Sequence, residues 1–251
     1  MTDLGPTPYD RILTLMDRLR QDCPWDREQS FETIAPYTIE ESYEVMDAIQ
    51  RGDMSDLKSE LGDLLFQVLF HSKMASETGV FDFKDVCDGL VEKMVRRHPH
   101  VFEGAEKPDW DTIKAAERTD KGDQKTLDGI ALSLPALMRA EKLQKRAAKT
   151  GFDWPDTEGP YEKLTEEIQE VKDAVSAGNP DEIESEIGDL LFSVVNLARK
   201  LKVDPEVALR NTNDKFTRRF NAIEEKAEPN LQSLTLDEME ALWQAAKKEG
   251  L

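Results

Sequence analysis

Acidic side chains recur in this sequence at a spacing suited to holding a divalent cation. Two pairs, each spaced three residues apart, would share one helix face: Glu41 with Glu44, and Glu60 with Asp63. Glu44 and Glu60 lie eight residues before and after Gly52. Glu41 and Asp63 lie eleven residues before and after it. In an antiparallel helical hairpin that turns at this glycine, we expect all four carboxylates to lie at the same height along the two helices. Crowded carboxylates need a counter-charge, and all-oxygen ligation is typical of Mg²⁺ or Mn²⁺.

The same arrangement recurs 126 residues further along the chain. Residues 59–66 read SELGDLLF, and residues 185–192 read SEIGDLLF. The string EExxE also occurs twice, at 40–44 and 166–170, which adds Glu40 to the first set. The second set, placed symmetrically about Gly178, comprises Glu166, Glu167, Glu170, Glu186 and Asp189. Landmarks that recur in one order indicate a tandem duplication.

Basic and aromatic residues follow each acidic set and could hold a phosphorylated substrate. Lys215 and Arg219 are four residues apart on one helical face, and Arg218 is adjacent. Near the C-terminal end, Trp243 could stack on a base, and Lys247, one turn later, favours phosphate or an acidic neighbour. The first half has the same landmarks at Lys93, Arg97, Trp110 and Lys114.

Apolar residues at three- and four-residue spacing predict an all-α protein that positions these side chains. We expect two tandem helical-bundle domains, an N-terminal one over 1–125 with a linker over 99–127, and a C-terminal one over 126–251. Trp25 and Trp154, which precede the acidic helices, are interpreted as packing residues. The helices are expected near residues 9–20, 33–50, 55–78, 82–98, 128–150, 161–177, 181–201, 205–227 and 235–249.

Composition excludes several classes of protein. The 251 residues include 33 Lys and Arg against 52 Asp and Glu, and the net charge of −19 disfavours a nucleic-acid partner or an anionic membrane surface. No apolar run approaches the roughly 18 residues of a membrane span. Two isolated cysteines favour a reduced, cytoplasmic setting. The chain has no Gly-rich phosphate loop.

These motifs together resemble the MazG family of nucleoside triphosphate pyrophosphohydrolases, in its tandem-domain form. The resemblance extends over residues 8–249 and rests on CPWD at 23–26, ELGDLLF at 60–66, KFTRRF at 215–220, and Trp243 with Lys247. It implies an all-α bundle, usually a homodimer, that hydrolyses nucleoside and deoxynucleoside triphosphates to monophosphate and pyrophosphate with Mg²⁺.

The resemblance also implies a role for each matching residue. Metal ligands would be Glu167, Glu170, Glu186 and Asp189, and Glu166 would assist the metal or the attacking water. Lys215 and Arg219 would neutralise charge on the triphosphate, and Trp243 and Lys247 would complete the nucleotide site. The corresponding set in the first half is Glu40, Glu41, Glu44, Glu60, Asp63, Lys93, Arg97, Trp110 and Lys114. The second half is favoured as the principal active site, and the first is left open as catalytic, regulatory or structural.

Two other functions fit the same residues. A non-enzymatic helical interaction protein could use the acidic faces to bind a partner, with any metal purely structural. An all-α nucleotidase restricted to one pyrimidine, similar to a dUTPase, would share the carboxylate hairpin. We expect a broad base preference, although the sequence does not identify the side chains that meet the base edge.

Overall fold

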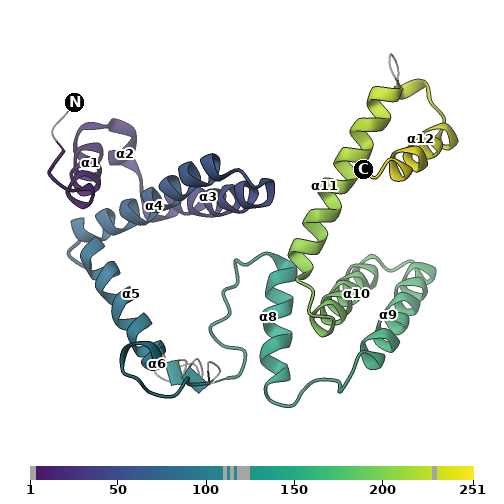
Figure 1. The fold of residues 1–251 in the computed structure, drawn as a ribbon. Helices are drawn as coiled ribbons and strands as arrows, with labels where there is room; N and C mark the ends of the chain where they lie inside the picture. The colour runs from purple at the N-terminus through teal and green to yellow at the C-terminus, as the bar shows by residue number, and fades with distance from the viewer. Residues whose placement is uncertain (1–3, 110–111, 114–115, 118–124, 228–230) are drawn as a thin grey trace. The chain divides into compact units, whose positions relative to one another are not determined.

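All the regular secondary structure is helical in the part of the chain that the structure describes, residues 4–109, 112–113, 116–117, 125–227 and 231–251. The computed structural model thereby confirms the all-α fold class (Figure 1). Its contacts divide the chain into two compact units, residues 1–114 and 115–251. No helix in the described part is long and apolar enough to cross a bilayer.

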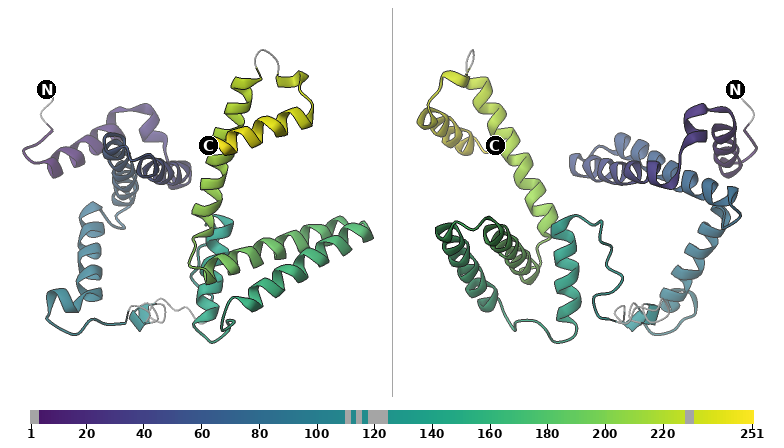
Figure 2. Two further views of the ribbon diagram at one scale, coloured as in Figure 1. Left: turned by 45° about the vertical axis from the view of Figure 1, so that its right-hand side comes forward. Right: turned by 180° about the vertical axis from the view of Figure 1, so that it is seen from behind.

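The first unit is built around a long helical hairpin. Helices α3 (Phe31–Arg51) and α4 (Met54–Glu77) run side by side (Figures 1 and 2). Gly52 ends α3 in the left-handed region with φ of 69°, which a residue with a Cβ adopts at a cost. The Asp53 side chain then accepts hydrogen bonds from the backbone N–H groups of Ser55 and Asp56, and so begins α4. This unit also contains α1 (Pro8–Asp22), α2 (Pro24–Glu28), α5 (Phe83–Arg97) and α6 (Pro99–Phe102).

The second unit repeats this hairpin. Helices α9 (Glu158–Ala177) and α10 (Pro180–Lys200) lie side by side, and Gly178 turns the chain with φ of 71°. Asn179 begins α10 by accepting a hydrogen bond from the backbone N–H of Asp181. Helix α8 (Ala136–Ala148) packs on α10. Helices α11 (Pro205–Lys226) and α12 (Leu236–Lys248) form a second hairpin in this unit, with a 3₁₀ turn at Leu231–Ser233 between them.

One expected helix begins much later than the sequence indicated. The helix expected over 128–150 starts at Ala136. Pro135 restricts the residue before it to extended conformations, and Gly129 is left-handed with φ of 73°. The short helix α2, opened by Pro24 at its first position, was not expected. The other long helices match their expected ranges to within a few residues.

The apolar core that is most continuous in the described residues lies in the first unit. Phe70 is fully buried on α4 and packs with Met16, Ile34, Leu69 and Met74. In the second unit the position equivalent to Leu69 is Val195, which is also fully buried. The position equivalent to Phe70 is Asn196, a polar residue. The two hairpins therefore share their helical framework but differ in the side chains that pack against it.

Candidate functional site

Each hairpin brings three of its acidic side chains together, one from its first helix and two from its second. In the second unit, one oxygen from each of Glu167, Glu186 and Asp189 lies within 4.8 Å of the others. Glu167 is only 2% exposed, and its Oε2 atom has no hydrogen-bond partner in the protein. A buried carboxylate oxygen without a partner is costly, and a hard cation would satisfy it. These donors therefore fit a divalent metal ion.

Lys163 forms ion pairs with one member of this cluster and with two neighbouring acids. Its Nζ atom lies 2.5 Å from an Oε atom of Glu167, 2.9 Å from one of Glu166 and 3.9 Å from one of Glu170. Hydrogen bonds to Glu167 and Glu166 raise the pKa of Lys163 above its ordinary value. Burial raises the pKa of Glu170. The charge of Lys163 opposes this rise, and the neighbouring carboxylates of Glu167, Glu166 and Glu186 add to it. Glu170 lines the cavity but is not one of the three acids whose oxygens converge. Glu166 is an exposed partner of the lysine.

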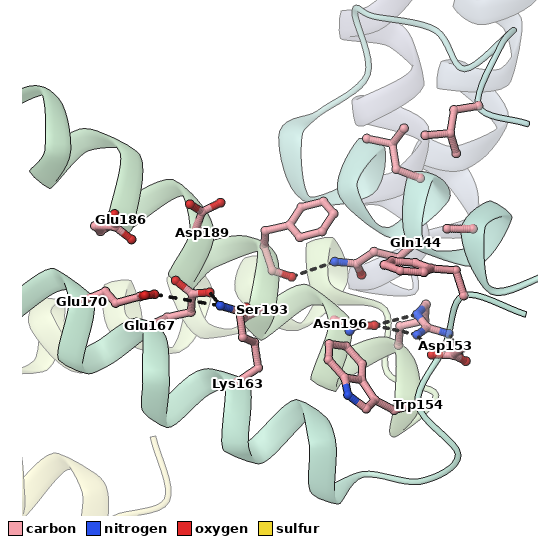
Figure 3. A pocket seen from close by; sticks show the side chains of 16 residues that line it. Gln144, Asp153, Trp154, Lys163, Glu167, Glu170, Glu186, Asp189, Ser193 and Asn196 are labelled. Carbon is pink, nitrogen blue, oxygen red and sulfur yellow. Dashed lines mark hydrogen bonds and ion pairs between the residues drawn. The ribbon is translucent and has the colours of Figure 1, made fainter. Parts of the chain in front are cut away.

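A cavity of 660 Å³ opens directly beside the carboxylates. Figure 3 shows Glu170, Glu186 and Asp189 on one side of it and Trp154 on the other. Helices α8, α9 and α10 and the segment before α9 all contribute to its lining, much of which is apolar. The lining residues are Leu127, Leu143, Gln144, Ala147, Phe152, Asp153, Trp154, Lys163, Glu167, Glu170, Glu186, Asp189, Phe192, Ser193, Asn196 and Arg199.

The segment that carries Trp154 is tied firmly to α10. Arg199 donates to both oxygens of Asp153, at 2.5 and 3.1 Å, and Lys200 Nζ lies 2.9 Å from the same carboxylate. Lys200 also donates to the carbonyl oxygen of Trp154. A Cβ atom at Gly159 would lie 2.1 Å from Cδ1 of the indole, so glycine is needed for the ring to pack on α9. Trp154 is therefore a cavity wall as well as a packing residue.

The ion pairs of Asp153 give the fold a pH dependence. Hydrogen bonds from Arg199, and then from Lys200, lower the pKa of Asp153 to about 2. An unfolded chain has an Asp pKa of about 3.9, so the stabilisation is present above that pH and is lost as the pH falls towards 2. With allowance for solvent screening, Asp153→Asn should lower the free energy of unfolding by about 1–2 kcal/mol at pH 7. Urea unfolding at pH 7, 4 and 3 measures this, and a difference that does not shrink with acid would contradict it.

The first unit has the equivalent cluster without the lysine. Oxygens of Glu41, Glu60 and Asp63 lie within 4.8 Å of one another. Burial and then the neighbouring carboxylate of Glu44 raise the pKa of Glu41. Tyr37 stands where the second unit has Lys163, and its ring packs edge-on against that of Trp25, with centroids 6.2 Å apart. Glu40 lies on the same helix, α3.

The basic and aromatic residues expected on the triphosphate are placed elsewhere in the described structure. The guanidinium of Arg219, on α11, lies 5.5 Å from the ring centroid of Trp243, on α12, and its Nε donates to an oxygen of Leu251. Lys215 and Arg218 share helix α11, and Lys247 shares α12. Among the described residues that line the cavity, none belongs to these two helices. In the first unit, Lys93 and Arg97 lie on α5. Trp110 and Lys114 lie outside the described residues.

Three of the polar cavity residues that were not expected from the sequence are Lys163, Asn196 and Gln144. Lys163 lies one turn before Glu167. An alignment of the two halves would have singled it out, because the equivalent residue in the first half is a tyrosine. The same comparison would have singled out Asn196, opposite Phe70. Gln144 carried no local signal, because α8 reaches the cavity only through tertiary packing.

Comparison with known proteins places both acidic hairpins in one family. The family described as "MazG nucleotide pyrophosphohydrolase domain" matches residues 29–102 and 158–223. The chain is 48% identical to the nucleoside triphosphate pyrophosphohydrolase of Escherichia coli (strain K12), over 96% of this chain and 97% of that protein. It is 43% identical to the nucleoside triphosphate pyrophosphohydrolase/pyrophosphatase MazG of Thermotoga maritima, over 95% of each chain. Each matched segment contains one carboxylate cluster.

Proposed function

Because this chain belongs to the MazG nucleotide pyrophosphohydrolase family, we propose that it hydrolyses nucleoside triphosphates to the monophosphate and pyrophosphate. The observation that carries the proposal is the cluster of Glu167, Glu186 and Asp189 in the lining of a 660 Å³ cavity in the second unit. The relatives from Escherichia coli and Thermotoga maritima are named for this activity. Release of pyrophosphate requires water to attack the α- or the β-phosphorus and the P–O bond that links these two groups to break.

We propose Mg²⁺ as the cofactor, with Mn²⁺ as a substitute. Glu167, Glu186 and Asp189 would hold the ion, with Glu170 beside them. A divalent cation bound there supplies positive charge to triphosphate oxygens and lowers the pKa of water. Glu166 is exposed and lies beside Lys163, where a carboxylate can accept a proton from the attacking water. Support for the metal is the orphaned Oε2 atom of Glu167.

The hairpin of α11 and α12 is the proposed source of the phosphate contacts. Arg219 and Trp243 are already neighbours there, and Lys215 precedes Arg219 by one helical turn. Arg218 and Lys247 add positive charge to the same pair of helices. A guanidinium held against an indole presents its remaining N–H groups to phosphate oxygens. This arrangement supports binding of an anionic substrate by the second unit.

A product assay tests the proposed function. The purified protein is incubated with Mg²⁺ and each of the common ribo- and deoxyribonucleoside triphosphates, and the products are separated by ion-exchange chromatography. We expect monophosphate and pyrophosphate in equal amounts with several bases. Nucleoside diphosphate and orthophosphate, or no turnover, would refute the proposal. Turnover of a single pyrimidine nucleotide would instead support a dUTPase-like enzyme.

Lys163 should compete with the metal for the second cluster. In Lys163→Met the carboxylates lose their internal counter-ion, so a divalent cation should bind about tenfold more tightly in the absence of nucleotide, which corresponds to about 1.4 kcal/mol. Calorimetric titration with Mn²⁺ measures this in a chain carrying Glu60→Gln and Asp63→Asn, so that only the second cluster contributes.

The matched control for this titration is in the other unit. A chain carrying Glu186→Gln and Asp189→Asn retains only the first cluster, where Tyr37 replaces the lysine. Its Mn²⁺ affinity should be close to that of the Lys163→Met protein. Weaker binding after loss of Lys163 would show that the lysine supports the metal rather than competing with it.

We also propose that the protein is a homodimer. Ile187, Leu191 and Val194 follow one another along one stripe of α10 and are 42–52% exposed. The first unit repeats the stripe at Leu61 and Leu65, which are 50% and 41% exposed. A second copy of the chain offers the same apolar stripes and would cover them. The mass in solution, from light scattering, checks the assembly.

A further inference from the structure

The cavity of the second unit has polar groups that neither a metal nor a triphosphate requires. Beyond the carboxylates its wall carries two side-chain amides, Gln144 from α8 and Asn196 from α10. Both are buried, at 7% and 9% exposed. Figure 3 shows them with Trp154 on the side of the cavity away from Glu186 and Glu170.

The amide of Gln144 is held in one orientation. Its Nε2 atom donates to the carbonyl oxygen of Phe192 at 2.8 Å. A carbonyl oxygen can only accept, so the –NH₂ group must face it and the oxygen must face the other way. That oxygen, Oε1, is buried and has no partner in the protein. Gln144 lines the cavity, and its Oε1 atom is a buried hydrogen-bond acceptor that is costly to leave unpaired.

The amide of Asn196 is fixed in the opposite sense. Arg199 donates to Asn196 Oδ1 through Nε at 3.0 Å and through a terminal nitrogen at 2.6 Å. A guanidinium has only donors, so the oxygen must face it and the –NH₂ group is left as the part that can act elsewhere. Asp153 holds the guanidinium from its other side at 2.5 Å. Asn196 thus contributes donors to a wall where Gln144 contributes an acceptor.

The first unit has the carboxylates but not this wall. Phe70 occupies the place of Asn196 and is fully buried in the apolar core with Met16 and Met74. Lys73 occupies the place of Arg199 and pairs with Asp17 at 2.6 Å. The two amides are therefore not needed to build a carboxylate hairpin, since its copy is built without them.

We propose that the cavity receives the nucleobase of the substrate, with Gln144 Oε1 accepting a base N–H and Asn196 Nδ2 donating to a neighbouring base nitrogen or carbonyl oxygen. This assignment rests on the proposed function. Every Watson–Crick edge presents an N–H group beside an acceptor atom. One acceptor and one donor therefore suit each of the four bases and discriminate strongly against a substrate that has no base. Trp154, which lines the cavity, adds apolar surface for the ring.

The test compares ATP with ribose 5′-triphosphate, which lacks a base. In Gln144→Met and in Asn196→Leu, kcat/KM for ATP should fall 10- to 100-fold, while the value for ribose 5′-triphosphate stays within twofold of wild type. The matched control is Gln67→Met in the first unit, since Gln67 is also a buried glutamine whose Oε1 has no partner. That variant should leave both values unchanged. Activity on the base-free substrate also shows that each variant is folded.

Equal losses on the two substrates would overturn the inference, because the amides would then support the structure or the chemistry rather than the base. An unchanged value for ATP would overturn it as well. Binding of a non-hydrolysable ATP analogue, measured by calorimetry in parallel, separates this inference from the proposed function. If wild type turns over no nucleotide, the proposed function fails. In that case, weaker binding of the analogue by Gln144→Met still supports the base site, and equal binding refutes it.

Discussion

Replacing Glu186 by Gln, or Asp189 by Asn, is expected to reduce kcat/KM for nucleoside triphosphates by about 10³-fold or more. Each change removes one negative charge from the three-carboxylate cluster and leaves the side-chain volume almost unchanged. Removing one group that stabilises developing charge commonly costs a factor of about 10²–10³, and loss of the metal's own contribution adds to this. The measurement is steady-state hydrolysis of ATP with saturating Mg²⁺, with helicity by circular dichroism as the control for folding.

The comparator is the same change in the first unit, Glu60→Gln with Asp63→Asn. Its cluster has matching geometry but adjoins an apolar core rather than an amide-lined cavity. We expect a smaller loss from this pair than from either single change in the second unit. A larger loss from the first-unit pair would place the principal active site there and contradict the assignment.

Replacing Phe70 by Ala is expected to destabilise the first unit by about 3–5 kcal/mol. The ring is 0% exposed, lies edge-on to Phe66 with centroids 5.8 Å apart, and has the guanidinium of Arg20 5.6 Å from its centroid. Truncation removes the apolar contacts and leaves a hole that the α1, α3 and α4 helices cannot close without moving. Calorimetric unfolding of the full chain should show a transition shifted to lower temperature.

The position equivalent to Phe70 provides the control. Asn196→Ala removes a side chain that borders an open cavity, so its effect on unfolding should be much smaller than that of Phe70→Ala. A similar loss of stability at both positions would show that the two units are packed alike. That result would contradict the contrast between an apolar core around Phe70 and an open cavity beside Asn196.

The carboxylate hairpins could be predicted because every interaction that forms them is local in sequence. Helical periodicity placed each acidic pair on one face, and a glycine with positive φ turned the chain midway between them. Acids at equal sequence distances from Gly52 or Gly178 were therefore expected at the same height on the two helices. Three acids of each hairpin do converge. The fourth expected acid of each hairpin, Glu44 or Glu170, is not part of its three-residue cluster.

The cavity could not be predicted because its polarity depends on contacts between distant segments. Gln144 presents an acceptor only because Phe192 O, 48 residues away, takes its –NH₂ group. Asn196 presents donors only because Arg199 is held by Asp153. A single sequence shows the amides but not which of their ends is left free. The late start of α8 at Ala136 reflects Pro135, whose effect on the preceding residues outweighed the apolar spacing.

The turns at Gly52 and Gly178 also bear on how the two halves could diverge. All the acids of one cluster lie within a single short stretch, 40–63 or 166–189, so a duplication copies a complete ligand set in one event. The wall with Gln144 and Trp154 comes from segments ahead of that stretch, and selection can alter it without disturbing the ligands. A copied gene of this kind starts with two equivalent ion sites. It can then specialise by changing only what surrounds one of them, as the exchange of Phe70 for Asn196 and of Tyr37 for Lys163 illustrates.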